Sequence, residues 1–180
     1  MNCNQAWSRE HYQPYGCHSK LWIDRVVPDV SSVEIHWNGC GAPWNVNYRL
    51  KDSDGEWSVI TVDQPTAKIT NLDEGCDYEF FVESDNEKSA VGYAKAGFVP
   101  GNVVNYLHPD DTKYAFSGRC LCTPSILIHP DGYYLASMDV FEGQSPQNLS
   151  IIFRSDDRGE TWYHLTELFP CFWGTLFMHK

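Results

Sequence analysis

The stretch Ile69-Thr-Asn-Leu-Asp-Glu-Gly75-Cys-Asp-Tyr78-Glu-Phe-Phe-Val82 contains the clearest indication of how the first half of the chain folds. Asp-Glu-Gly is a turn sequence, because Gly75 can adopt the positive φ that tight turns need. After the turn, Tyr78, Phe80 and Val82 recur at every second position, which predicts that one face of a β-strand is buried. The stretch therefore predicts two strands joined by a tight turn.

The same alternation continues on both sides of this stretch. Val33, Ile35 and Trp37 alternate with polar residues, so we expect a strand there with one buried and one wet face. Further strands are expected at 21–30, 46–50, 57–63 and 90–98, with turns such as Asp52–Gly55 between them. Seven short strands with turns every 8–12 residues predict a β-sandwich over residues 21–100.

The composition of the whole chain agrees with an all-β fold. The 180 residues include 10 Pro, 13 Gly, 7 Trp, 10 Tyr and 9 Phe, as short strands with tight turns require. The net charge of −11 repels polyphosphate, so we expect no nucleic-acid partner and no anionic membrane surface. No apolar run approaches the ~20 residues of a membrane span.

Residues 1–20 have no periodic pattern, and we interpret them as an N-terminal extension or as part of an incomplete preceding element. They contain no basic stretch followed by an apolar core, so no secretory signal is visible. The chain has seven cysteines, an odd number, so at least one thiol is free or pairs between chains. Two localisations stay open: a cytoplasmic chain, or a secreted one whose leader lies upstream.

A family resemblance covers the first of these regions. Trp37, Ile69–Leu72, Gly75 and Tyr78–Val82 together resemble the fibronectin type III domain over roughly residues 21–100. The resemblance implies that Tyr78 forms a tyrosine corner, in which the hydroxyl bonds back to upstream backbone while the ring packs. Domains of this kind are mostly spacers or interaction modules, and the fold alone implies no catalysis.

Pro100-Gly101 marks a boundary, because both residues interrupt regular structure. Beyond it the sequence predicts four strands in succession, and the first is expected to be buried. The predicted strands are Ser125–Ile128, Tyr133–Val140, Leu149–Arg154 and Thr161–Leu165. Four consecutive antiparallel strands are typical of one propeller blade.

One motif in this region is specific. Ser155, Asp157, Gly159, Thr161 and Trp162 fit the pattern Ser-x-Asp-x-Gly-x-Thr-Trp. The Asp157 carboxylate can accept N–H groups across a hairpin turn, Gly159 allows a positive φ, and Trp162 can anchor the turn by burying its ring. The five residues resemble the structural Asp box (BNR repeat) of sialidase-like propellers.

The resemblance to sialidases extends upstream of the Asp box, to the opening blade of that family. It includes Thr123–Ile126, Pro130–Gly132, Leu135–Asp139 and Phe153–Ser155. The resemblance implies glycoside hydrolysis, with release of a terminal sialic acid as the family default. That chemistry uses an Asp acid/base, a Tyr nucleophile paired with a Glu, and three arginines that bind the sugar carboxylate.

Only part of this machinery maps onto the chain. Asp139 matches the family position and is the candidate catalytic acid/base, and Glu142 is the only carboxylate in the loop that follows. Cys122 and Phe141 stand where two arginines are expected, while Arg119 lies three residues too early unless a bulge moves it. Arg119 and Glu142 are therefore the candidate substrate-binding residues. The competing interpretation is that Asp139 caps a turn just behind a strand end and Glu142 is solvated.

The remaining residues, 101–180, suffice for one blade and the start of a second. An isolated blade leaves its apolar faces exposed to solvent. At ~25 cal/mol per Å², leaving a few hundred Å² of apolar surface exposed loses several kcal/mol of folding free energy. We therefore expect further blades after Lys180. The Tyr, the Glu and the remaining arginines would lie there too, so we expect this chain alone to be inactive.

Two function classes follow from these resemblances. The first is the N-terminal portion of a sialidase-like exo-glycosidase acting on terminal glycan sugars. The second is a non-catalytic propeller that binds glycan or protein, with the fibronectin-like domain as an interaction module. We expect no cofactor and no metal, because Cys120-Leu-Cys122 with His108 and His129 nearby lacks a second cysteine pair at a recognised spacing.

Overall fold

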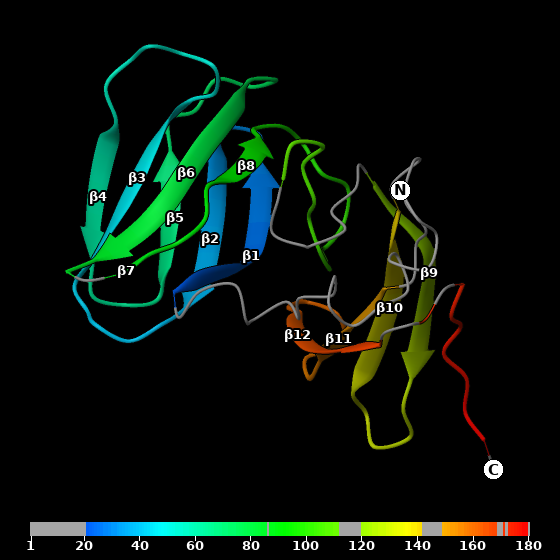
Figure 1. Ribbon diagram of the computed structural model, residues 1–180. Helices are drawn as coiled ribbons and strands as arrows, with labels where there is room; N and C mark the ends of the chain where they lie inside the picture. The colour runs from blue at the N-terminus through cyan, green and yellow to red at the C-terminus, as the bar shows by residue number, and fades with distance from the viewer. Residues whose placement is uncertain are drawn as a thin grey trace, which may run out of the picture. The chain divides into compact units, whose positions relative to one another are not determined.

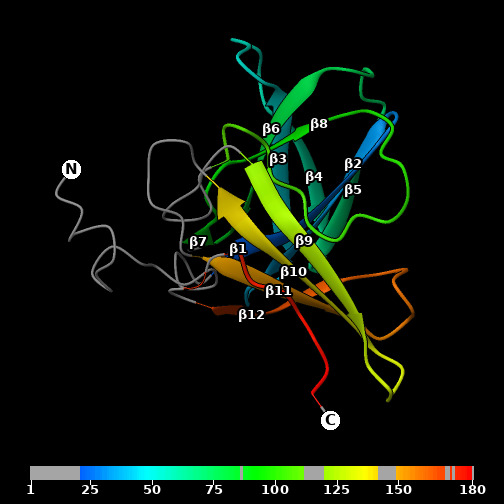
Figure 2. The ribbon, with the colours of Figure 1, turned by 90° about the vertical axis from the view of Figure 1, so that its right-hand side faces the viewer.

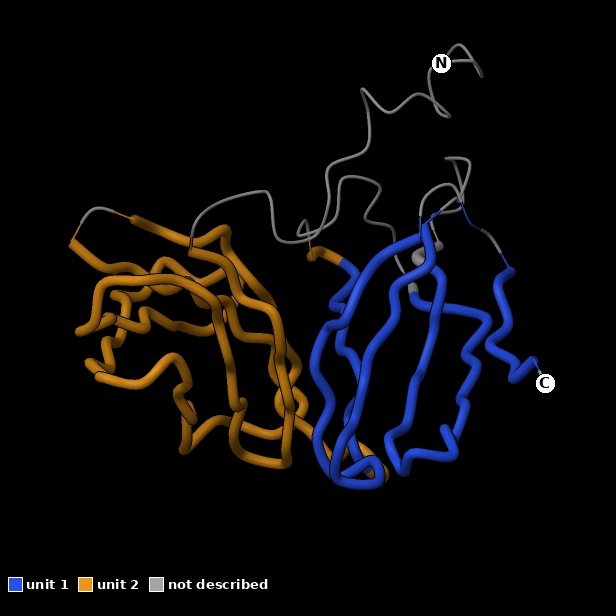
Figure 3. The backbone as a smooth tube through the Cα atoms, turned by 90° about the horizontal axis from the view of Figure 1, so that it is seen from below, with its two compact units in different colours: residues 1–15, 102–109, 114–180 blue, residues 16–101, 110–113 orange. Residues whose placement is uncertain are grey.

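The computed structural model describes residues 21–85, 87–111, 120–141, 149–168, 171 and 173–179. Within these residues the regular structure consists of β-strands alone, and no helix has the length and hydropathy of a membrane span. The chain divides into two compact units, coloured separately in Figure 3. One comprises residues 16–101 and 110–113, and the other residues 1–15, 102–109 and 114–180.

The first unit is a sandwich of two antiparallel sheets (Figure 1). Its strands are β1 (Trp22–Asp29), β2 (Ser32–Asn38), β3 (Trp44–Leu50), β4 (Ser58–Val62), β5 (Thr66–Thr70), β6 (Asp77–Ser84), β7 (Glu87–Lys88) and β8 (Gly92–Lys95). One sheet has the order β1-β2-β5. The other has the order β4-β3-β6, and β6 also pairs with both β7 and β8. The predicted all-β, fibronectin type III-like sandwich is confirmed by this arrangement.

The core of the sandwich lies between the two sheets and is built from the alternating apolar residues. Six of its fully buried side chains come from four strands: Val33, Ile35, Val46, Ile69, Phe80 and Val82. Gly92 on β8 is required by this packing, because a Cβ there would lie 2.7 Å from Cε2 of Phe80. The ring of Phe80 therefore fills the space that a side chain at position 92 would take.

The turn before β6 is fixed by a tyrosine. Tyr78 is buried, and its hydroxyl oxygen accepts the backbone N–H of Asp73 at 2.9 Å. Gly75 in this turn has a φ of 81°, in the region that favours glycine. The tyrosine corner implied by the family resemblance is therefore present.

The end of the sandwich differs from the expectation of one strand over 90–98. The hydroxyl of Ser89 accepts the Val82 N–H at 3.0 Å and donates to the carbonyl of Ala90 at 2.9 Å. The Ser89 backbone N–H still donates to the Val82 carbonyl at 2.8 Å, so the side chain replaces only the acceptor side of this pairing, and β8 begins at Gly92. The backbone pairing with the segment before β6 continues through Ala96, whose N–H donates to the Cys76 carbonyl, and then changes partner at Gly97, whose N–H donates to the Asp29 carbonyl.

The second unit contains a four-stranded antiparallel sheet. Its strands are β9 (Cys120–Ile128), β10 (Tyr134–Phe141), β11 (Ser150–Ser155) and β12 (Tyr163–Leu168). They follow the order β12-β11-β10-β9, so each strand pairs with its neighbour in sequence (Figure 2). The register of β9 against β10 shifts between Ser137 and Asp139, where β9 has one extra residue. In the described residues the sheet is open, so a propeller beyond this one sheet stays a prediction.

The expectation of a buried strand at Ser125–Ile128 is wrong in part. Ile126 and Ile128 are each 63% exposed, because β9 is an edge strand of an open sheet. The buried residues of this unit instead come mainly from the two central strands and from the β11–β12 turn. They include Ala136, Met138, Ile151, Phe153 and Trp162.

Candidate functional site

The hairpin between β11 and β12 is closed by the residues of the predicted Asp box. Asp157 accepts the Thr161 N–H at 2.9 Å through Oδ1 and the Thr161 hydroxyl at 2.5 Å through Oδ2. Ser155 Oγ donates to Asp157 Oδ1 at 2.7 Å and accepts the Gly159 N–H at 2.7 Å. The loop is therefore held mainly by its own side chains, and Asn102 Nδ2 from another segment also donates to the Gly159 carbonyl at 2.9 Å.

Burial and backbone conformation complete this turn. Trp162 is buried, and its ring N–H donates to the carbonyl of Gly159 at 3.1 Å. Arg158 and Gly159 have φ values of 63° and 94°. The hydrogen bonds from Thr161 and Ser155 lower the pKa of the Asp157 carboxyl from 3.8 to about 2. Asp157 is thus ionised near neutral pH and committed to the turn.

A second group of side chains lies beside the Asp box. The Arg154 guanidinium donates to Asp156 Oδ1 at 2.8 Å and 2.6 Å, and lies 4.0 Å from the ring centroid of Tyr133. Tyr163 donates its hydroxyl proton to Asp156 Oδ2 at 2.8 Å. These two donors lower the pKa of Asp156, and its negative charge raises the pKa of Tyr163. Arg154 therefore links its own turn to Tyr133, the residue before β10.

Asp139, the candidate acid/base, lies within β10 rather than behind its end, so the interpretation that it caps a turn is wrong. It is 1% exposed. Oδ1 accepts the Ser150 hydroxyl, and Oδ2 accepts both the Thr123 hydroxyl and, at 2.7 Å, the Trp173 backbone N–H. Its two oxygens are thus engaged by three neighbouring segments, and a substrate does not reach them in this conformation.

The other two predicted site residues, Arg119 and Glu142, lie outside the described residues. Asp139 and the Asp box lie at opposite ends of the β10–β11 pair. Asp139 is paired with Ser150, whereas Ser155 is paired with Tyr134. Five residues separate these positions along each strand, a distance of roughly 17 Å at 3.3 Å per residue. The Asp box therefore supports the sheet from its far end and does not take part in chemistry at Asp139.

Sequence reasoning missed the donors around Asp139. Thr123, Ser150 and Trp173 lie 16, 11 and 34 residues away in sequence. The hydroxyls at 123 and 150 carried a usable signal, because both belong to strands that flank β10. The Trp173 amide carried none, since a backbone N–H has no sequence signature.

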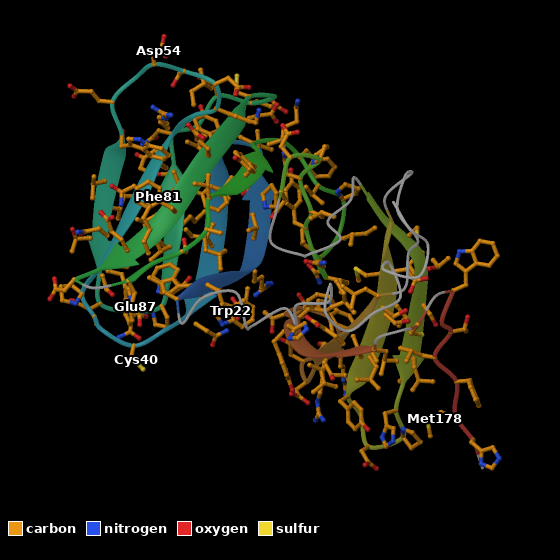
Figure 4. All side chains as sticks on the ribbon, in the orientation of Figure 1. Trp22, Cys40, Asp54, Phe81, Glu87 and Met178 are labelled. Atoms are coloured by element: carbon orange, nitrogen blue, oxygen red, sulfur yellow. The ribbon has the colours of Figure 1, made fainter. Side chains whose placement is uncertain are left out.

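The sandwich carries a cluster of cations and aromatic rings on the outer face of its larger sheet. Arg49 Nε lies 2.5 Å from Glu79 Oε1, and its guanidinium carbon lies 4.4 Å from the ring centroid of Trp57. Trp57 packs edge-on against Phe81, and Lys88 Nζ lies 3.4 Å from the Phe81 ring centroid. Phe81, labelled in Figure 4, is thereby covered although it points away from the core. Alternating cations and rings of this kind stabilise an exposed sheet face.

The cysteines and metal ligands give no further site among the described residues. Cys40, Cys76 and Cys171 are free thiols. Within the described ranges no three His, Cys, Asp or Glu side chains are grouped so that they could hold a metal ion.

Comparison with known proteins adds fold neighbours and no family. No protein-family model matches the chain, and no curated protein matches it. The FN5 domain of Drosophila Lar is 18% identical, with a TM-score of 0.37; the match covers 43% of this chain and 97% of that domain. The sensor domain of the anti-sigma factor RsgI4 of Pseudobacteroides cellulosolvens is 18% identical, with a TM-score of 0.34, over 45% of this chain and 96% of that one. A redesigned β-sandwich protein is 11% identical, with a TM-score of 0.35, and the match covers 42% of this chain and 94% of that protein. Nothing about activity follows from similarities of this size.

Proposed function

We propose that this chain is part of a carbohydrate-active protein of the sialidase-like type, in which the four-stranded sheet is one propeller blade. The observation that supports this most is the hydrogen-bonded hairpin of Ser155, Asp157 and Thr161 between β11 and β12. The four strands of that sheet are also arranged in the order in which they occur in the sequence. In this proposal the ligand is a terminal sugar of a glycan, and the fibronectin-like sandwich is a spacer or interaction module.

Within this proposal, hydrolysis would rest on Asp139 as the acid/base, with Arg119 and Glu142 contacting the sugar. Asp139 is held in one orientation by Thr123 and Ser150, which is how an enzyme positions a proton-transfer group. A proton donor must also reach the leaving-group oxygen. The Trp173 amide must then leave Asp139 before a glycan can be cleaved.

A second candidate is a non-catalytic glycan- or protein-binding protein. The burial of Asp139 favours it, because both carboxylate oxygens already accept hydrogen bonds within the chain and neither is open to a leaving group. Asp boxes are compatible with either candidate, since their hydrogen bonds form within the turn.

Glycan binding and hydrolysis, measured on the same preparations, separate these possibilities. We expect the 180-residue chain to bind at least one terminal sugar on a glycan array and to release no fluorophore from a fluorogenic sialoside. A longer natural form that includes further blades would hydrolyse the sialoside under the first candidate and only bind under the second. The Asp139→Asn variant of that form would lose turnover and keep its fold.

A control variant and a negative result complete this test. Asp156→Asn, which changes an exposed carboxylate in the other half of the sheet, should leave binding and turnover unchanged. Absence of both binding and turnover with every glycan tested, in each form, would reject the carbohydrate proposal.

A further inference from the structure

The extended segment of residues 173–179, which we name the strap, lies along the four-stranded sheet. The Trp173 N–H donates to Asp139 Oδ2 at 2.7 Å, and the Leu176 N–H donates to Ser125 Oγ at 3.1 Å. Asp139 belongs to β10 and Ser125 to β9. The strap is thus attached to two strands through their side chains, without the backbone ladder that would make it a fifth strand.

Apolar burial contributes little to this attachment. Trp173 is 69% exposed and Phe177 is 76% exposed, and Met178, labelled in Figure 4, is also exposed. Only Gly174 and Leu176 are half-buried between them. Because burial is the main driving force for packing, apolar contact supplies little of the strap's attachment, and the N–H bonds of Trp173 and Leu176 contribute to holding it.

The backbone of Trp173 adopts a conformation that is uncommon for a bulky residue. Its φ is 56°, in the left-handed region that disfavours side chains with a Cβ. Such conformations persist only where surrounding contacts hold them. The bond to Asp139 is the contact made by the amide of that same residue.

The sheet beneath the strap is organised for this contact. Ser150 engages one oxygen of Asp139, and Thr123 engages the oxygen that also accepts the Trp173 N–H. Ser137, on the same face of β10, has a buried hydroxyl without a hydrogen-bond partner.

We propose that Asp139 is a positioning residue that anchors the strap, and that the strap detaches as a unit while the four strands stay paired. In the attached state the Asp139 carboxylate is covered. In the detached state Asp139 Oδ2 no longer accepts the Trp173 N–H. This inference goes beyond the proposed function, because it holds whether or not the protein acts on a glycan.

Hydrogen exchange of individual amides in the full 180-residue chain tests the proposal. Asp139→Asn removes the negative charge and replaces one carboxylate oxygen with an NH₂ donor, so the Trp173 N–H loses its charged acceptor in either orientation of the amide. We expect the Trp173 and Leu176 amides to exchange roughly ten- to a hundredfold faster, the range expected for loss of a hydrogen bond to a charged group. The amides of β10 and β11 should keep their protection.

A second variant tests the anchor from the strap side, where the sheet is left untouched. Trp173→Pro removes the N–H and cannot adopt a φ of 56°. Trp173→Ala removes the exposed ring and keeps the N–H. We expect fast exchange of the Leu176 amide in Trp173→Pro and near wild-type exchange in Trp173→Ala.

Three results would overturn the anchor. They are unchanged Leu176 exchange in both Asp139→Asn and Trp173→Pro, equal acceleration in Trp173→Pro and Trp173→Ala, and loss of β10 and β11 protection in step with the strap. If Asp139→Asn does not fold, the Trp173 pair decides the question alone.

Discussion

The sandwich and the four-stranded sheet are both antiparallel, yet they bury their apolar residues differently. In the sandwich each sheet covers the other, so the alternating residues of β2, β3 and β6 are fully enclosed. The sheet of β9–β12 has no second sheet of its own among the described residues, and its edge strand leaves Ile126 and Ile128 exposed. In a unit of two sheets, each sheet therefore buries the alternating apolar residues of the other. A single sheet depends on its turns and flanking segments to cover its apolar residues.

The two units also fix their turns by different chemistry. Tyr78 closes its turn with a buried ring and one hydrogen bond from Asp73. Asp157 closes its turn with an exposed carboxylate that accepts several hydrogen bonds. Removing the Tyr78 hydrogen bond should lower the free energy of unfolding at any pH. The stabilisation by Asp157 should be lost in acid, where its carboxylate is protonated. The following substitutions test this contrast.

The largest expected effect is in the sandwich core. Phe80→Ala removes a fully buried ring that also packs against Gly92, and we expect the free energy of unfolding to fall by about 4–5 kcal/mol. Urea denaturation of the chain, followed by far-UV circular dichroism, measures the change. Val59→Ala, at an exposed position of β4, is the matched control and should change stability by less than about 0.5 kcal/mol. Similar losses in both variants would mean that the two sheets do not enclose a common core.

The corresponding test in the four-stranded sheet is Trp162→Ala. We expect a loss of about 3 kcal/mol, at the lower end for a buried ring, because the turn around Gly159 can partly collapse into the space. Denaturation monitored at residues of β11 and β12 by NMR reports this change. An effect as large as that of Phe80→Ala would show that the single sheet is as well packed as the sandwich.

A smaller effect is expected at the tyrosine corner. Tyr78→Phe keeps the ring and removes the hydroxyl, so the Asp73 N–H loses its acceptor and stability falls by about 1 kcal/mol. The shift in urea midpoint measures it, and Tyr48→Phe, at a half-buried position of β3, serves as the control. If the two variants are equally stable, the corner hydrogen bond contributes nothing net.

The smallest effect is acid sensitivity of the Asp-box turn. The folded-state pKa of Asp157 lies at about 2, below its ordinary 3.8, so the ionised carboxylate stabilises the turn. That contribution is complete above about pH 4 and is lost as pH falls toward 2. We expect the Thr161 amide signal to titrate with a midpoint near 2, and Asp157→Asn to abolish that titration. A midpoint at 3.8 would contradict the prediction, and the Asp73 amide at the tyrosine corner should not follow the same curve.

Period-two alternation was sufficient to predict the sandwich. Positions such as Val33, Ile35 and Phe80 are buried because side-chain direction in a strand is set locally. Alternation was insufficient at strand ends, where the Ser89 hydroxyl accepts the Val82 N–H in place of a backbone carbonyl. It also failed for Ile126 and Ile128, because exposure at a sheet edge depends on which strands come next to it.

The candidate site was predictable only where its contacts are local. The Asp box spans eight residues, so its hydrogen bonds follow from the spacing of Ser155, Asp157 and Thr161. The environment of Asp139 is assembled from three distant segments, and one donor is a backbone amide. Its burial therefore depends on the tertiary structure, which no local pattern encodes.

The extra residue in β9 has a consequence for how that strand tolerates change. Ser125 faces Ser137 and Cys122 faces Asp139, so an odd number of steps separates two residues that share a side. After the bulge, odd-numbered residues such as Ser125 lie on the side of the sheet that carries Ser137 and Asp139. Before the bulge, even-numbered residues such as Cys122 lie on that side. In saturation mutagenesis along 120–128, sensitive and tolerant positions should therefore alternate, and the alternation should shift by one residue at Thr123 and Pro124. Deletion of one of these two residues should remove the shift, so that sensitive positions alternate regularly along the whole strand.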